Sequence, residues 1–165
     1  MIEKNAPNTT CRTSSEEDTL RLGRLLGRLL VPGMTVLLYG DLGTGKTVLV
    51  RGVGEALGAT RVRSPSFTLV NEYRTSRAEL VHADLYRLEP GGVEELSLEE
   101  YLSNGCVLFV EWPERWDAPP RDEVLKIEIT AEGETGRKFS FSPSGVGADR
   151  ILERLKAEMK EMENS

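Results

Sequence analysis

The residues with the strongest chemical signal form one glycine-rich segment, Gly-Asp-Leu-Gly-Thr-Gly-Lys-Thr, at positions 40–47. This segment fits the phosphate-loop pattern G-x-x-x-x-G-K-[ST], in which glycines let the backbone curl and turn its N–H groups towards phosphate oxygens. We expect Lys46 to bridge the β- and γ-phosphates of ATP and the Thr47 hydroxyl to bind Mg²⁺, which prefers hard oxygen ligands. The residues of this segment predicted to bind the nucleotide are Leu42, Gly43, Thr44, Gly45, Lys46 and Thr47.

Two carboxylates stand at the ends of apolar segments that are typical of buried strands. Glu111 follows five apolar residues, and Asp84 ends a second such segment. The carboxyl ends of parallel strands meet at the edge of the sheet where the phosphate loop lies, and hydrolysis needs an acid near the metal and the attacking water. We therefore predict that Asp84 and Glu111 act in catalysis with Lys46. Glu111 is the predicted magnesium partner of Thr47, and the alternative for either acid is an ordinary carboxylate at a strand end.

Other polar and aromatic side chains lie close to these segments in the sequence. His82, the only histidine, faces the same side of its predicted strand as Asp84, and we interpret it as a structural hydrogen-bonding residue rather than a catalyst. Ser66 and Thr68 fall in a loop where switch proteins place a hydroxyl that senses the γ-phosphate, with a simple turn as the alternative. Trp112 is predicted to contact the nucleotide, and packing at the domain edge is its alternative.

Hydrophobic periodicity predicts the elements that must hold these residues. Helices are expected at residues 14–31, 46–57, 93–102 and around 151–159. Strands are expected at residues 34–39, 68–73, 79–84, 106–110, 124–130 and 137–142, the last two as a half-exposed hairpin. The glycine-rich segment thus follows a strand and opens a helix, a context that argues against a chance glycine-rich turn. The order predicts a three-layer α/β fold of the P-loop NTPase type, with a mixed, mainly parallel sheet flanked by helices.

Length and composition limit the organisation and the partners of the chain. With 165 residues, we expect one domain at residues 14–160, a disordered segment at 1–13 and a frayed end at 161–165. A net charge of −6 opposes direct wrapping of nucleic acid, so any contact with nucleic acid is expected to be indirect. The two cysteines have no metal-binding or disulfide spacing, and no signal peptide or membrane span is evident, which favours the cytoplasm.

The sequence also separates several classes of nucleotide-binding protein. A GTPase would carry N-K-x-D or T-K-x-D for the guanine base, and no lysine here is followed by x-Asp. No arginine stands out as an arginine finger, so we expect slow ATP hydrolysis that partners complete. Two alternatives remain: a docking module in which ATP acts as a switch and hydrolysis is incidental, and a small-molecule kinase, for which the chain has little room.

Four ordered motifs together resemble one family. They are Gly-Asp-Leu-Gly-x-Gly-Lys-Thr at 40–47, Ser-Pro-x-Phe-Thr-Leu at 64–69, His-x-Asp-Leu-Tyr-Arg at 82–87 and Val-Glu-Trp-Pro at 110–113. Over about residues 14–141, the chain resembles TsaE, the bacterial ATPase family of tRNA threonylcarbamoyladenosine (t6A) synthesis. The resemblance implies a partner of TsaB and TsaD, whose complex places threonylcarbamoyl on adenosine 37 of tRNAs that read codons beginning with A. In that family the ATPase supports repeated turnover and does not itself perform the transfer.

The resemblance also implies roles for individual residues. It gives magnesium and phosphate binding to the residues that spacing selects, Thr47, Glu111 and Lys46, and it makes Asp84 functionally required. Nucleotide contacts that the family makes before its first helix and in its late strands correspond to Ser14 and Arg137, for which helix capping and an ordinary hairpin charge are the alternatives. Val48 stands where the family commonly has threonine, whose hydroxyl often touches the α-phosphate. This difference predicts nucleotide binding weaker by ~1 kcal/mol, the value of one hydrogen bond.

Overall fold

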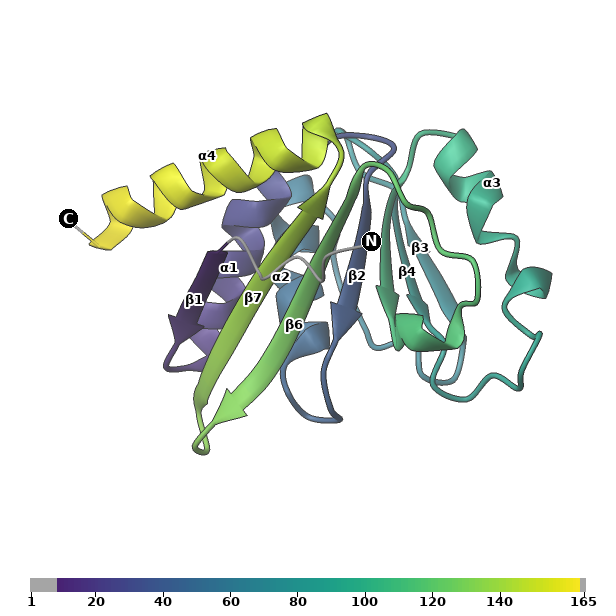
Figure 1. Cartoon of the computed structure of the whole chain (residues 1–165), viewed down its shortest axis with the longest axis horizontal. Coiled ribbons are helices and arrows are strands. Elements are labelled where there is room, and N and C mark those ends of the chain that lie inside the picture. The colour runs from purple at the N-terminus through teal and green to yellow at the C-terminus, as the bar shows by residue number, and fades with distance from the viewer. Residues whose placement is uncertain (1–8, 164–165) are drawn as a thin grey trace, which may run out of the picture.

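Within residues 9–163, which the computed structural model describes, seven strands form one mixed sheet with helices packed on it (Figure 1). The strand order is β1-β7-β6-β2-β5-β4-β3. The strands are β1 (Thr9–Thr13), β2 (Thr35–Tyr39), β3 (Val70–Tyr73), β4 (Leu80–Asp84), β5 (Val107–Glu111), β6 (Val124–Glu132) and β7 (Gly136–Ser144). The helices are α1 (Glu16–Leu29), α2 (Lys46–Leu57), α3 (Leu98–Ser103) and α4 (Val146–Glu163), with 3-10 turns η1 (Glu94–Leu96) and η2 (Pro113–Arg115).

The centre of the sheet consists of parallel strands. Strands β6, β2, β5 and β4 run parallel, and antiparallel neighbours lie beside this group, β7 next to β6 and β3 next to β4. All residues of β4 and β5 are buried; β5 is accordingly apolar up to Glu111, whereas His82 and Asp84 interrupt the apolar residues of β4. The predicted three-layer α/β fold with a mixed sheet is confirmed.

Helices cover the two faces of the sheet unequally. Side chains of α1, α2 and α4 share one apolar core with the sheet, whereas α3 contributes to a second, smaller core over β2, β4 and β5. On the side away from the larger core, β6 exposes Lys126, Glu128 and Thr130 to solvent. The alternation of apolar and polar residues in β6 and β7 therefore reflects a half-exposed hairpin, as predicted.

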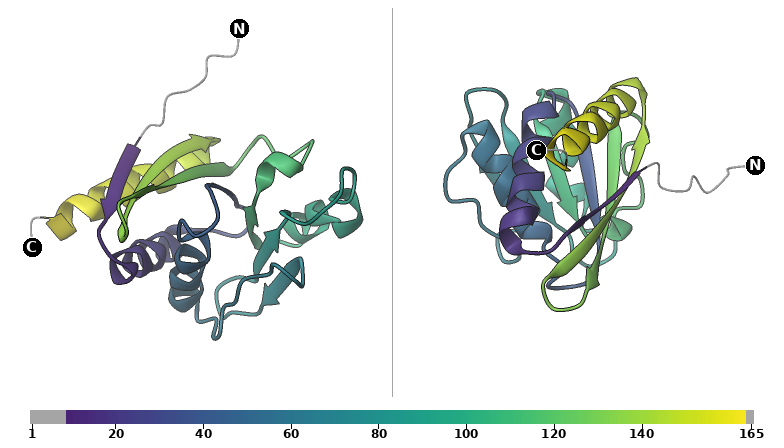
Figure 2. Two further views of the ribbon diagram at one scale, coloured as in Figure 1. Left: turned by 90° about the horizontal axis from the view of Figure 1, so that it is seen from below. Right: turned by 90° about the vertical axis from the view of Figure 1, so that its left-hand side faces the viewer.

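Helix α1 packs closely against α2, the helix that follows the phosphate loop (Figure 2). The Ser15 hydroxyl caps α1 by accepting the N–H of Asp18 at 3.1 Å. Gly23 and Gly52 face each other where the helices cross, and a Cβ atom added to Gly23 would lie 2.4 Å from the Leu49 carbonyl oxygen. This backbone contact fixes the position of α2, and therefore of the residues at its first turn.

Both ends of the chain correct the sequence prediction. Residues 9–13, expected to be disordered, form β1, which pairs with β7 from Thr9 opposite Phe141 to Thr13 opposite Arg137. The polar composition of this segment suggested disorder. Backbone pairing with β7 and the packing of Cys11 on the core nevertheless hold it as a strand. Helix α4 continues through 161–163, where fraying was expected, and 1–8 and 164–165 lie outside the described residues. Over the described part of the chain, no helix is long and apolar enough to cross a membrane.

Candidate functional site

The glycine-rich segment forms a tight loop between β2 and α2. Gly45 precedes the first residue of α2 with φ 100°, a left-handed conformation that glycine adopts without steric cost. Gly40 lies so close to β6 that an added Cβ would be 2.6 Å from the Ile129 carbonyl oxygen. No side chain caps the N-terminus of α2, so its first N–H groups are available to an anion.

Arg137 holds the outer side of this loop. Its guanidinium donates to the carbonyl oxygens of Thr44 at 3.0 Å and Gly43 at 3.3 Å. Because the C=O and N–H of a trans peptide unit point in opposite directions, the amide of Gly45 faces away from Arg137. The arginine thus stabilises the loop conformation that a phosphate-binding nest requires.

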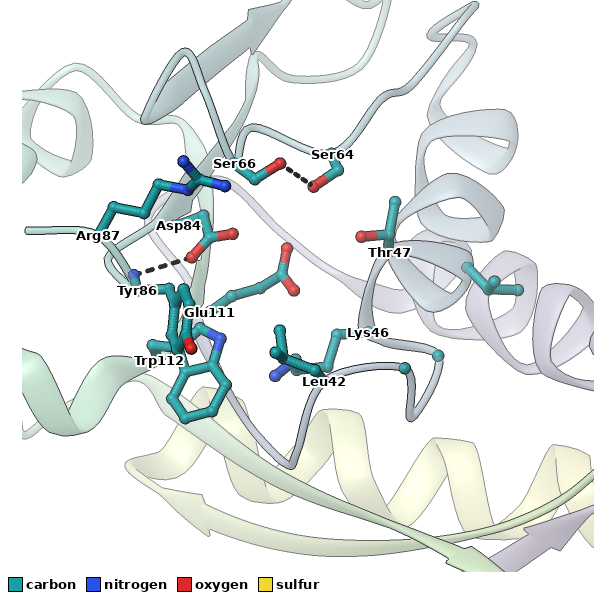
Figure 3. A pocket seen from close by; sticks show the side chains of 13 residues that line it. Leu42, Lys46, Thr47, Ser64, Ser66, Asp84, Tyr86, Arg87, Glu111 and Trp112 are labelled. Carbon is teal, nitrogen blue, oxygen red and sulfur yellow. Dashed lines mark hydrogen bonds between the residues drawn. The ribbon is translucent and has the colours of Figure 1, made fainter. Parts of the chain in front are cut away.

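A cavity of about 480 Å³ opens beside the loop, at the carboxyl ends of β4 and β5 (Figure 3). From the loop and α2 it is lined by Leu42, Gly43, Gly45, Lys46, Thr47 and Val48. From the opposite wall it is lined by Ser64, Ser66, Asp84, Tyr86, Arg87, Glu111 and Trp112. The predicted residues of the loop and the two predicted acids therefore meet around one space.

The two acids lie side by side because β4 and β5 are parallel neighbours with Asp84 opposite Glu111. Both are buried, with 7% and 4% of their surfaces exposed. The imidazole Nε2 of fully buried His82 lies 2.7 Å from Glu111 Oε2, while its Nδ1 has no partner within the described residues. A proton on Nδ1 would be left unsatisfied, so His82 donates from Nε2 to Glu111. The interpretation of His82 as a hydrogen-bonding residue agrees with this contact.

Burial changes the pKa values of Lys46 and Asp84. Desolvation lowers the pKa of the Lys46 ammonium, against the attraction of Glu111 and Asp84. Desolvation likewise raises the pKa of the Asp84 carboxyl, although the Tyr86 N–H donates to it at 2.9 Å. The Lys46 ammonium donates to the Gly40 carbonyl and lies 4.3 Å from the centre of the Trp112 ring. The site is therefore a desolvated cation and two desolvated acids facing one cavity.

We expect Asp84→Asn to stabilise the nucleotide-free protein at pH 7. A raised folded-state pKa contributes stability below the unfolded value of about 3.9, and that stability is lost as the pH rises through the folded value. At pH 7 the charged carboxylate is thus disfavoured by the fold, and asparagine keeps an oxygen for the Tyr86 N–H. Thermal unfolding should show a midpoint higher by about 2–4 °C at pH 7. The difference should shrink towards pH 4, and a lower midpoint at pH 7 would contradict the assignment.

The remaining predicted residues are placed unequally. Trp112 lines the cavity and packs against Tyr86, with ring centres 4.8 Å apart. Ser66 also lines it, whereas the Thr68 hydroxyl donates to Asn71 at 2.6 Å and does not line it. The Ser14 hydroxyl donates to the Asp18 carboxylate at 2.7 Å. This contact at the N-terminus of α1 is of the helix-capping kind that was the alternative to nucleotide binding for Ser14.

A second cavity, of about 250 Å³, lies on the other side of the loop. It is lined by Ser15, Glu16, Thr19, Gly43, Gly45, Val48, Glu134, Thr135 and Arg137. Ser15, and not Ser14, reaches this space, together with Arg137. Gly43, Gly45 and Val48 line both cavities, so the two cavities adjoin at the phosphate loop.

Sequence reasoning missed several lining residues. Tyr86 and Arg87 lie two and three residues after Asp84, and their place just beyond a strand end was a signal that pointed to the same edge of the sheet. Ser15 and Thr19 were not predicted as site residues, because a serine that caps a helix and a threonine within a helix both have an ordinary structural interpretation. Glu134 and Thr135 lie in the β6–β7 turn, and no local pattern links that turn to a loop almost a hundred residues earlier.

The fold and the loop together define the class of protein. A parallel sheet in which β2 leads through G-x-x-x-x-G-K-T into α2, with acids on neighbouring strands, is the architecture of P-loop NTPase-like proteins. Residues 13–139 match the family of the threonylcarbamoyl adenosine biosynthesis protein TsaE. The chain belongs to the TsaE family.

Individual relatives agree with this assignment. The chain is 42% identical to TsaE of Nostoc over 79% of its own length and 83% of that protein, and 37% identical to TsaE of Bacillus subtilis over 87% and 91%. It also resembles the crystal structure of Bacillus subtilis YdiB, with a TM-score of 0.78, 31% identity, and coverage of 91% of this chain and 95% of that one.

Proposed function

We propose that the chain is the ATP-hydrolysing subunit of t6A synthesis at adenosine 37 of tRNAs that read codons beginning with A. In this proposal it acts in the cytoplasm with TsaB and TsaD, meets tRNA only through their complex, and is not the transferase. Membership of the TsaE family supports the pathway. The observation that carries the ATPase assignment is the meeting of the loop residues with Asp84 and Glu111 around one cavity.

The donors of the site fit a magnesium nucleotide. Mg²⁺ takes one or two protein oxygens and completes its shell with phosphate oxygens and water. The Thr47 hydroxyl and the Glu111 carboxylate supply such oxygens and lie on facing walls of the cavity (Figure 3). His82 orients the Glu111 carboxylate through its 2.7 Å hydrogen bond. When bound, the ion would neutralise phosphate charge, which is its part in the chemistry.

The chain's own residues would divide the remaining tasks. Lys46 is the phosphate clamp, and it must exchange the Gly40 carbonyl for phosphate oxygens when the nucleotide enters. Asp84, held next to Glu111 by strand register, is placed to orient the attacking water. The ring of Trp112 lies against the Lys46 ammonium, with its centre 4.3 Å from Nζ. The second cavity, with Ser15 and Arg137, is the proposed place of the ribose and base.

One experiment tests partners and role together. The chain is mixed with TsaB and TsaD, with and without ATP, and both co-elution and multiple-turnover t6A formation are measured. We expect ATP to be hydrolysed faster with the partners present and modification to stop after about one turnover without the chain. Failure to co-elute and to stimulate modification would contradict the proposal. Phosphoryl transfer to a small molecule without partners would favour a kinase instead.

The docking-module alternative is separated by two variants. If Glu111→Ala and Asp84→Ala still co-elute with TsaB and TsaD but no longer support modification, hydrolysis is required. If both variants remain fully active, ATP acts only as a docking switch. These variants are suited to the question because both side chains lie inside the cavity, away from the surface.

We expect Val48→Thr to tighten nucleotide binding. Val48 lines both cavities, at the first turn of α2, so a hydroxyl there would lie beside the phosphate chain. One added hydrogen bond corresponds to ~1 kcal/mol, or about a fivefold lower dissociation constant for ATP. Titration calorimetry checks the value, with Val48→Ala as a control that removes bulk without adding a donor. Equal affinity of Val48→Thr and wild type would count against the placement.

A further inference from the structure

Arg87 supplies the cavity with a second cation. Of the residues that line this cavity, only Lys46 and Arg87 carry positive charge, and they come from opposite walls. The side chain of Arg87 extends along the wall that carries Asp84 and points towards Ser66 (Figure 3). Its charge therefore lies on the side of the cavity that Lys46 does not reach.

The backbone of Arg87 is held in a fixed relation to both acids. The Asp84 carboxylate accepts the Tyr86 N–H at 2.9 Å, and the Glu111 carbonyl accepts the Leu85 N–H at 3.1 Å. Leu85 is fully buried in the smaller core, and the Leu88 N–H closes the turn onto its carbonyl at 3.2 Å. The backbone of Arg87 therefore lies in an anchored turn, while its side chain is exposed.

The guanidinium of Arg87 keeps its hydrogen-bond donors for a ligand. Among residues 9–163 it forms no ion pair and no hydrogen bond, whereas Arg24 and Arg51 are paired with glutamates. It lies 4.5 Å from the centre of the Phe67 ring, in the loop that also carries Ser66. Stacking on an aromatic face orients a guanidinium without occupying its N–H groups.

A second cation beside the terminal phosphoryl group favours phosphoryl transfer. In the transition state of phosphoryl transfer, charge spreads over the three equatorial oxygens of the terminal phosphoryl group, and arginines commonly compensate it. Two acids, Asp84 and Glu111, face the same cavity, so Arg87 would add a protein cation to the charge that Lys46 and a bound Mg²⁺ would supply. Arg87 is far from the phosphate loop along the chain, and the strand order brings it to the same cavity.

We propose that Arg87 is a catalytic residue that binds the terminal phosphoryl group of ATP and compensates its charge during hydrolysis. This inference rests on the proposed ATPase function. The water oxygen bonds to the γ-phosphorus as the bond to the β-phosphate oxygen breaks, which gives ADP and inorganic phosphate. One water proton stays on the phosphate and the other is released to solvent, while Arg87 keeps its charge throughout.

The test compares Arg87→Ala and Arg87→Lys with Arg74→Ala in the full chain. Arg74 is a matched control because it is an exposed arginine that does not line the cavity. Single-turnover hydrolysis of Mg-ATP is measured, together with binding of ADP alone and of ADP with aluminium fluoride, a mimic of the phosphoryl transition state. Circular dichroism melting confirms that each variant is folded.

We expect Arg87→Ala to lower the hydrolysis rate about 100-fold, as the loss of one donor to transition-state charge typically does. It should also abolish the tighter binding of the fluoride adduct, while ADP alone binds within about twofold of wild type and Arg87→Lys recovers part of both effects. Arg74→Ala should match wild type. If Arg87→Ala hydrolyses ATP and binds the adduct like wild type, the inference is overturned but the ATPase function stands. A wild-type chain that neither hydrolyses ATP nor prefers the adduct overturns both.

Discussion

Replacing Glu111 by glutamine is expected to lower ATP hydrolysis by roughly 100–1000-fold, as removal of one key electrostatic group from an active site typically does. Glutamine has the same size and still accepts the Nε2–H of His82, so the buried contact survives. What is lost is the negative charge that would hold Mg²⁺. The expected consequence is a much weaker dependence of ATP binding on magnesium, with binding of metal-free ADP nearly unchanged.

Three measurements check this expectation. Hydrolysis is followed at increasing Mg²⁺ concentration, nucleotide binding is measured with and without the metal, and t6A formation is assayed with TsaB and TsaD. Glu114→Gln is the matched control, because Glu114 is an exposed acid three residues away that does not line the cavity. Hydrolysis by Glu111→Gln within about threefold of wild type would remove Glu111 from the mechanism and leave Asp84 as the main acid.

The second large effect concerns stability and comes from the crossing of α1 and α2. An alanine Cβ at Gly52 would lie 2.4 Å from the Leu20 carbonyl oxygen and 3.0 Å from the Gly23 Cα. Both are backbone atoms of α1, so the overlap is relieved only by moving one helix. We expect Gly52→Ala to destabilise the protein by about 2–3 kcal/mol, even though alanine favours helix formation by about 1 kcal/mol over glycine.

Gly54→Ala is the matched comparison for this prediction. It makes the same substitution in the same helix, but its new Cβ meets a side-chain methyl of Val62 at 2.5 Å, which can move more easily than backbone. Its effect should be less than half as large in urea unfolding. Gly52→Ala should also weaken ATP binding, because α2 carries Lys46 and Thr47 at its first turn. A Gly52→Ala variant as stable as wild type would show that the helices separate without penalty.

Much of the fold could be predicted because the relevant information is local. The phosphate loop is defined by glycines that permit its backbone conformation, together with the strand before it and the helix after it. The bounds of α2, residues 46–57, were predicted correctly, since propensity and periodicity act over a few residues. Strands β4 and β5 were recognisable as apolar runs, and acids at their ends were therefore expected at one edge of the sheet.

The local signal failed where long-range pairing decides the structure. The short polar segment 9–13 shows no strong strand pattern, yet it is ordered by pairing with β7, more than a hundred residues away. Arg137 was selected by the family resemblance alone and not by any local pattern, and only the closure of the sheet brings its guanidinium to the carbonyls of Gly43 and Thr44. Arg87 likewise depends on long-range pairing. It lies opposite Lys46 because β4 pairs with β5, which in turn pairs with β2.

The sequence by itself determined which groups carry the chemistry: a phosphate loop with Lys46 and Thr47, and two acids that end apolar strands. Tertiary structure alone decided how these groups meet. It placed Asp84 opposite Glu111, formed the hydrogen bond between His82 and Glu111, and left a cavity on each side of the loop. The reason is physical, because backbone conformation follows from neighbouring residues, whereas strand register and side-chain contacts follow from packing between segments far apart in the chain.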